Sequence, residues 1–217
     1  QAPAVHARPR VVVGAAQLVR IGLLVTLVAL VVGSIQFARY DWTGVRFQRA
    51  SNERDVRVTD DCTELLRPFE TTSGRIIAPA PLDEQQYLSM IQRFRGEQDL
   101  QVECFYAPFT DRAALPWVAS TLPFEDALSL GLLNTAFMLI GIWAVLAALA
   151  VQGFSARVVL AVGVLVSANW VVFAFGTTLM IESAPFAVVA VCWWLMSVRR
   201  WWWVVPVVAL GVLVKET

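Results

Sequence analysis

Carboxylates are the main acid–base groups of this chain, which has 17 aspartates and glutamates but a single histidine. A carboxylate can act as a general base, and an arginine or lysine can bind a phosphate. Long apolar stretches separate segments that carry acidic residues from segments that carry only basic ones. The segments without any acid hold His6, Arg8, Arg10, Arg20, Arg157, Arg199 and Arg200. The acids occupy the alternate segments, from Asp41 through Asp126, at Glu182 and at Glu216. This alternation is typical of a multi-pass membrane protein with cytoplasmic arginines.

The composition agrees with a membrane protein, because 58% of the residues are hydrophobic, 16% are charged and the mean hydropathy is +0.62. Five apolar stretches can be compared with the roughly 20 residues that cross a bilayer. They run over Ile21–Phe37, Ala127–Val151, Val158–Met180, Ala184–Val198 and Trp201–Val214. The sequence therefore predicts a mainly α fold, a multi-pass transmembrane helix bundle with an extracytoplasmic loop domain that carries juxtamembrane helices.

This topology divides the chain into four parts. We expect residues 1–20 to be a cytoplasmic tail, 21–37 the first span, 38–126 the extracytoplasmic loop and 127–217 spans two to five. Joining the last two stretches into one span would bury Arg199 and Arg200 at a large cost, so a cytoplasmic turn between two short spans is favoured. Tryptophans of an interfacial belt flank that turn: Trp193, Trp194, Trp201, Trp202 and Trp203. Both ends of the sequence look cut, and we expect the N-terminal fragment of a longer protein.

Two cysteines of the loop, Cys62 and Cys104, lie on the side where disulfides form. A bridge between them would close a loop of roughly 40 residues and contribute about 3 to 4 kcal/mol. Two unrelated thiols are the alternative. Because the pair has no histidine partner, it is a poor zinc site.

The loop also contains the best helix pattern outside the spans, from Leu82 to Phe94, closed by Gly96. Its apolar stripe consists of Tyr87, Met90, Ile91 and Phe94. Asp83 and Gln86 form a capping-box pattern at its start. We expect this helix to lie flat at the interface, with the stripe in the headgroup boundary and with Arg93 and Arg95 near lipid phosphates. A second interfacial helix is predicted over Trp117–Leu122.

An ordered set of short motifs follows along the chain. It consists of Asp83-Glu84-Gln85-Gln86-Tyr87-Leu88, Arg95-Gly96, Ala107-Pro108-Phe109 with Arg112 and Pro116, Leu133-Asn134, Ile181-Glu182-Ser183, and Val214-Lys215-Glu216-Thr217. In order and in side of the membrane, the set resembles the GT-C class of membrane glycosyltransferases, which use polyprenyl-phosphate sugars. The resemblance covers most of the chain from Leu82 onward. No single motif in it is specific, whereas the ordered set is moderately so.

The resemblance implies an inverting sugar transfer to an acceptor hydroxyl on the extracytoplasmic face. A carboxylate serves as general base. Asp83 is preferred, because it carries the local motif and opens a surface helix; Asp41 is the second choice, because it lies nearer to the first span, where the family usually places its acid. The expected substrate-binding residues are Glu84, Tyr87, Arg112, Glu182, Lys215 and Glu216. Arg112 and Lys215 would stabilise the leaving lipid phosphate. The acceptor is a glycan, lipid or protein, and the resemblance implies no organic cofactor and no nucleic acid. Some members of the class use a divalent cation.

Other interpretations of the same residues stay open. Asp83 is equally suited to capping its helix, and Asn134 within a span more often bonds to a neighbouring helix than to a ligand. Arg112 can be an ordinary interfacial arginine. The alternative function is a non-enzymatic multi-pass membrane protein whose disulfide-bonded extracytoplasmic domain binds or senses a partner. A transporter is less favoured, because the spans carry almost no ionisable groups.

Overall fold

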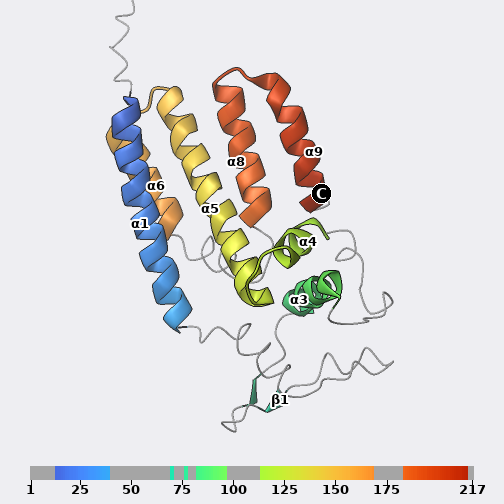
Figure 1. Ribbon diagram of the computed structural model, residues 1–217. Helices are drawn as coiled ribbons and strands as arrows, with labels where there is room; N and C mark the ends of the chain where they lie inside the picture. The colour runs from blue at the N-terminus through green and yellow to red at the C-terminus, as the bar shows by residue number, and fades with distance from the viewer. Residues whose placement is uncertain are drawn as a thin grey trace, which may run out of the picture.

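The computed structural model describes residues 13–39, 69–70, 76–77, 82–96, 113–168 and 183–214, and this part of the chain is mainly helical (Figure 1). Two helices are long and apolar enough to cross a membrane, α1 (Ala15–Arg39) and α5 (Asp126–Val151). At 1.5 Å per residue, each is longer than the roughly 30 Å of a bilayer's hydrocarbon core. The helix predicted over Ala127–Val151 is therefore confirmed, with its start one residue earlier.

The first helix begins earlier than the sequence analysis expected. It starts at Ala15 rather than Ile21, so Arg20 lies within the helix and not in the preceding tail. Residues 15–20 contain neither glycine nor proline, and alanine, glutamine, leucine and arginine are all good helix formers. Arg20 is exposed, and its long side chain can carry the charge toward the near end of the helix.

Three apolar helices are shorter than α1 and α5. They are α6 (Ala156–Ala168), α8 (Ser183–Ser197) and α9 (Val204–Val214), the last preceded by the 3-10 turn η4 (Trp201–Trp203). Helix α8 matches the stretch predicted over Ala184–Val198, and η4 with α9 matches the stretch predicted over Trp201–Val214. Helix α6 begins two residues before its prediction, and the second half of that predicted stretch lies outside the described residues.

These five helices lie side by side and alternate in direction along the chain (Figure 1). Helix α5 makes its most extensive contact with α8, which in turn contacts α9, while α1 packs on α6. Two further helices, α3 (Leu82–Arg95) and α4 (Ala114–Ser120), lie at the end of the bundle where α5 and α8 begin and α9 ends. We name this the α3–α4 end. The opposite end carries the α5–α6 and α8–α9 connections, and we name it the Arg199 end.

Glycines allow the helices to approach closely. A Cβ at Gly141 of α5 would overlap the ring of Phe186 in α8, and one at Gly22 of α1 would overlap the Trp143 ring of α5. The indole of Trp143 also donates a 3.0 Å hydrogen bond to Thr26 Oγ1 of α1. Small residues and isolated polar bonds at helix crossings are typical of helices that pack within a bilayer, where lipid competes for apolar surface.

Outside the helices, the described residues include a two-residue strand pair. Strands β1 (Phe69–Glu70) and β2 (Ile76–Ile77) are antiparallel, with Phe69 opposite Ile77 and Glu70 opposite Ile76. The chain therefore reverses direction between them, beyond the α3–α4 end of the bundle (Figure 1).

Candidate functional site

Helix α3 carries the residues to which the sequence analysis assigned most of the chemistry. It spans Leu82–Arg95 and ends at Gly96, so the predicted helix is confirmed. Gly96 has a φ of +72°, a conformation that suits glycine after a helix C-terminus. Asp83 is the second residue of the helix rather than its N-cap. A carboxylate in the first turn still favours the positive end of the helix dipole. The side chains of Asp83 and Glu84 lie outside the described set.

The apolar stripe of α3 is buried in protein. Tyr87, Met90 and Ile91 are 2%, 5% and 0% exposed, whereas Phe94, the fourth member, is 43% exposed. The cluster they join also contains Leu88 of α3, Leu115 and Ala119 of α4, Leu130 of α5 and Ala184 of α8. The expectation of a place in the lipid headgroup boundary is therefore wrong for Tyr87, Met90 and Ile91, because three other helices supply the apolar surface that covers them. For the exposed Phe94 it stays a prediction.

Helix α4 begins at Ala114, three residues before the predicted interfacial helix. Pro116 lies in its first turn, where a missing N–H costs no hydrogen bond. Leu115 and Ala119 face α3, while Trp117 and Val118 are 57% and 37% exposed. The helix thus has a protein side and an exposed apolar side, and an interfacial role for that exposed side stays a prediction.

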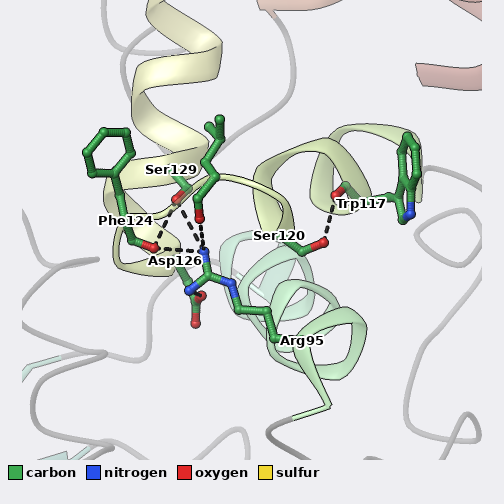
Figure 2. A network of polar contacts seen from close by, with 7 residues as sticks. Arg95, Trp117, Ser120, Phe124, Asp126 and Ser129 are labelled. Carbon is green, nitrogen blue, oxygen red and sulfur yellow. Dashed lines mark hydrogen bonds and ion pairs between the residues drawn. The ribbon is translucent and has the colours of Figure 1, made fainter.

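Arg95 ties the end of α3 to the start of α5 (Figure 2). Its Nη1 lies 2.8 Å from Asp126 Oδ1, and its Nη2 donates to the carbonyl oxygens of Leu122 and Phe124 at 3.0 and 2.7 Å. A longer contact of 3.4 Å reaches Ser129 Oγ, which itself donates to the Phe124 carbonyl. The guanidinium therefore holds both the α4–α5 connection and the first turn of α5.

The Arg95–Asp126 pair is largely withdrawn from water. The side chain of Asp126 is 1% exposed and that of Arg95 is 18% exposed. The contact is an ion pair, and the carbonyl contacts of Arg95 Nη2 satisfy further donors of the guanidinium. The expectation that Arg95 meets lipid phosphates is wrong, since the protein occupies this guanidinium. Arg93 is exposed and keeps that expectation open.

A second polar contact joins α5 to α8 beside the apolar cluster. Ser183 Oγ donates a 2.9 Å hydrogen bond to Asn134 Oδ1, and the two side chains are 1% and 0% exposed. The interpretation of Asn134 as a residue that bonds to a neighbouring helix is confirmed. Ser183 follows Glu182 directly in the sequence, so this bond fixes the first described residue after a predicted binding residue.

Most of the predicted site residues lie outside the described residues: Asp41, Arg112, Glu182, Lys215, Glu216, Cys62 and Cys104. Their described neighbours nevertheless meet at the α3–α4 end. Arg112 precedes Ala113 at the start of α4, Glu182 precedes α8, and Lys215 follows the last residue of α9. Helix α4 contacts α3, α5 and α9, and the end of α9 lies beside it in Figure 1.

Tyr87 is the predicted substrate-binding residue whose side chain the structure describes. Its ring is 2% exposed within the cluster of α3, α4, α5 and α8, which gives it a packing role. Binding to a substrate stays a prediction for Tyr87 and requires the ligand to reach its buried edge. Within the described residues, no group of three or more His, Cys, Asp or Glu could hold a metal ion, and the expectation of a divalent cation stays untested.

The described polar side chains hold the ends of the helices in place. The Arg95–Asp126 pair and the Asn134–Ser183 bond fix the starts of α5 and α8 and the end of α3. The side chains of the reacting groups that the sequence analysis proposed, those of Asp83, Asp41, Arg112 and Lys215, lie outside the described set. Comparisons of the chain with known protein families, with curated proteins and with solved structures found no match.

Proposed function

We propose that this chain belongs to a multi-pass membrane glycosyltransferase of the GT-C type. The reaction is the transfer of a sugar from a polyprenyl-phosphate carrier to an acceptor hydroxyl on the extracytoplasmic face. One observation carries the proposal: the cluster around Tyr87 collects residues of α3, α4, α5 and α8 at one end of the bundle. The four helices that carry or adjoin resembling segments therefore meet at that end.

The charge distribution supports the membrane orientation. The acids among the described residues are Glu70, Asp83, Glu84, Glu125 and Asp126, and all belong to elements at or beyond the α3–α4 end. Arg157, Arg199 and Arg200 lie at the opposite end. Cytoplasmic segments of membrane proteins are enriched in Lys and Arg, so the α3–α4 end is extracytoplasmic in the proposed topology. The alternating directions of α1, α5, α6, α8 and α9 fit five spans in that orientation.

The position of Asp83 on α3 supports its role as the general base. It precedes Tyr87 by four residues, about one helical turn, and so belongs to a helix whose described side chains pack with α4, α5 and α8 at the α3–α4 end.

The proposed reaction is a single displacement. The acceptor hydroxyl loses its proton to the Asp83 carboxylate, its oxygen bonds to the anomeric carbon, and the bond from that carbon to the carrier phosphate breaks. The phosphate leaves as an anion, and Arg112 and Lys215 stabilise its new charge. General-base assistance of this kind contributes about 10²- to 10⁴-fold in rate.

The test is a transfer assay with the membrane-embedded protein and a panel of polyprenyl-phosphate sugars. Asp83→Asn should abolish transfer while the amount of folded protein in the membrane stays normal, and Asp41→Asn should retain transfer. Loss in Asp41→Asn with activity retained in Asp83→Asn would move the base to the other aspartate. A correctly folded protein that transfers no sugar from any carrier would contradict the proposal and favour the binding or sensing alternative.

The orientation has its own test, independent of the sugar. A reporter that works only outside the cytosol should be active when inserted near Gly74, between β1 and β2. If that reporter is inactive there while a cytosol-specific reporter at the same position is active, the α3–α4 end lies on the wrong side for a polyprenyl-phosphate donor and the proposed reaction is excluded.

A further inference from the structure

The connection between α8 and α9 is a tightly bonded helix terminus with an unusual residue at its centre. Helix α8 ends at Ser197, the Arg199 N–H donates to the Met196 carbonyl at 3.1 Å, and the Arg200 N–H donates to the Leu195 carbonyl at 2.8 Å. This pair of bonds defines a Schellman motif, which needs a left-handed residue just after the helix. Arg199 fills that position with a φ of 58°.

The same chain builds the same motif with glycine a short distance away. At the end of α5, the Gly153 N–H donates to the Ala150 carbonyl at 3.0 Å, and the Phe154 N–H donates to the Leu149 carbonyl at 3.2 Å. Gly153 has a φ of +82°. The two motifs are neighbours, because Gln152 Nε2 donates a 2.9 Å hydrogen bond to Ser197 Oγ.

This comparison separates the backbone's requirement from the side chain's contribution. A left-handed conformation is unfavourable for a residue with a Cβ and free of that penalty for glycine. Among the described residues, Arg199 is the non-glycine residue that adopts it. Strained backbone positions of this kind cluster at functional sites such as ligand clamps. The backbone of the turn does not require an arginine here, because Gly153 fills the same position at the end of α5.

The surroundings of this guanidinium indicate its ligand. Arg199 and Arg200 are both exposed, and no acidic residue occurs in the described segments 128–168 and 183–214 that form this end of the bundle. Three consecutive indoles follow directly, with Trp201, Trp202 and Trp203 exposed to 58%, 89% and 62%. Exposed tryptophans settle at the level of lipid headgroups. Because Trp201 follows Arg200 directly, tryptophans in the headgroup layer would bring the two arginines to the depth of the lipid phosphates.

We propose that Arg199 and Arg200 form a binding site for the headgroup phosphate of an anionic phospholipid in the leaflet at the Arg199 end. Guanidinium groups bind phosphate oxygens in a bidentate manner, and the three tryptophans hold the turn in the headgroup layer. A soluble phosphate would not explain the exposed indoles, which need an apolar and a polar surface side by side. The proposal depends on the membrane placement of the bundle and not on sugar transfer.

The purified protein in detergent, titrated with phosphatidylglycerol or phosphatidylcholine and followed by native mass spectrometry, tests this site. We expect a preference for phosphatidylglycerol that falls about fivefold for each arginine removed, in Arg199→Gly and in Arg200→Gln. Arg199→Gly is informative because Gly153 shows that the turn accepts glycine, so its melting temperature should stay equal or rise. Arg157→Gln, which removes an exposed arginine of the same end from outside the α8–α9 turn, is the matched control and should keep the preference.

Three results would overturn the site. These are an unchanged preference in both single variants, Arg199→Gly and Arg200→Gln, an equal loss in Arg157→Gln, and equal binding of phosphatidylglycerol and phosphatidylcholine by the unaltered protein. Glycerol 3-phosphate, added as a competitor at constant ionic strength, should not displace the lipid. Full displacement would show a soluble-phosphate site and would also contradict the proposal.

Discussion

Separating Arg95 from Asp126 should destabilise the protein by an amount that depends on which partner is removed. Arg95→Met removes the guanidinium from beside the Asp126 carboxylate, whose side chain is 1% exposed, so it should cost about 3 to 5 kcal/mol. Asp126→Asn should cost less, about 1.5 to 3 kcal/mol. The guanidinium is 18% exposed and keeps its bonds to the Leu122 and Phe124 carbonyls. The order of the two costs follows from the unequal burial of the two groups.

The double variant Arg95→Met/Asp126→Asn measures the pair itself. Once residue 126 is neutral, removal of the arginine should destabilise the protein less. The loss of stability in the double variant should therefore be smaller than the sum of the two single losses, by at least about 1.5 kcal/mol. The assay is reversible unfolding in mixed micelles, followed by tryptophan fluorescence. Arg93→Met is the matched control on the same helix and should stay within about 0.5 kcal/mol of the unaltered protein. Strictly additive costs, or a larger cost for Asp126→Asn than for Arg95→Met, would refute the reasoning.

Two further substitutions test the packing of the helices. Gly141→Leu should reduce stability by about 1 to 3 kcal/mol or prevent folding, because the new side chain would overlap Phe186 and the Ala187 backbone. Gly14→Ala is the control, because nothing lies within 4 Å of the added Cβ, and it should be neutral in the same unfolding assay. Ser183→Ala should cost about 0.6 to 1.7 kcal/mol, because it loses the buried hydrogen bond to Asn134. Ser120→Ala is the control and should cost less, because the exposed Ser120 hydroxyl donates to the Trp117 carbonyl within α4. Equal costs would contradict the role of the buried bond.

Local patterns in the sequence predicted the helices well and their surroundings poorly. The 3.6-residue period of Tyr87, Met90 and Ile91, together with Gly96, was sufficient to predict α3. The same stripe can face lipid or protein, because both are apolar, and the sequence around it does not distinguish them. What decides is the surface that α4, α5 and α8 present, which is a property of distant segments. The start of α1 was misplaced for a related reason, since a charge such as Arg20 marks an interface without ending a helix.

Of the two buried polar contacts of the candidate site, one was predicted from the sequence and the other was missed. Asn134 was correctly interpreted as a helix–helix bond, because an amide within an apolar stretch needs a partner at almost any packing. The Arg95–Asp126 pair was missed, although both residues stand at recognisable helix ends. An acid at the start of an apolar helix favours the helix dipole by itself, so Asp126 gave no signal of a distant cation. Only the packing of α3 under α5 brings the two charges together.

The way α3 is held has a consequence for the proposed base. Its middle is fixed by the Tyr87–Ile91 cluster and its end by Arg95, so protein contacts rather than lipid set its place relative to α5. Asp83 lies twelve residues before Arg95, and α3 therefore acts as a lever of about 18 Å. A pivot of about 5° at one end moves the other by about 1.5 Å, and a misplacement of 1 Å can lower a rate about a hundredfold. A helix that merely floated in the headgroup layer could not hold a general base to that tolerance. Burial of the stripe is thus what the proposed chemistry requires of α3, and the interfacial placement expected from the sequence would have served it less well.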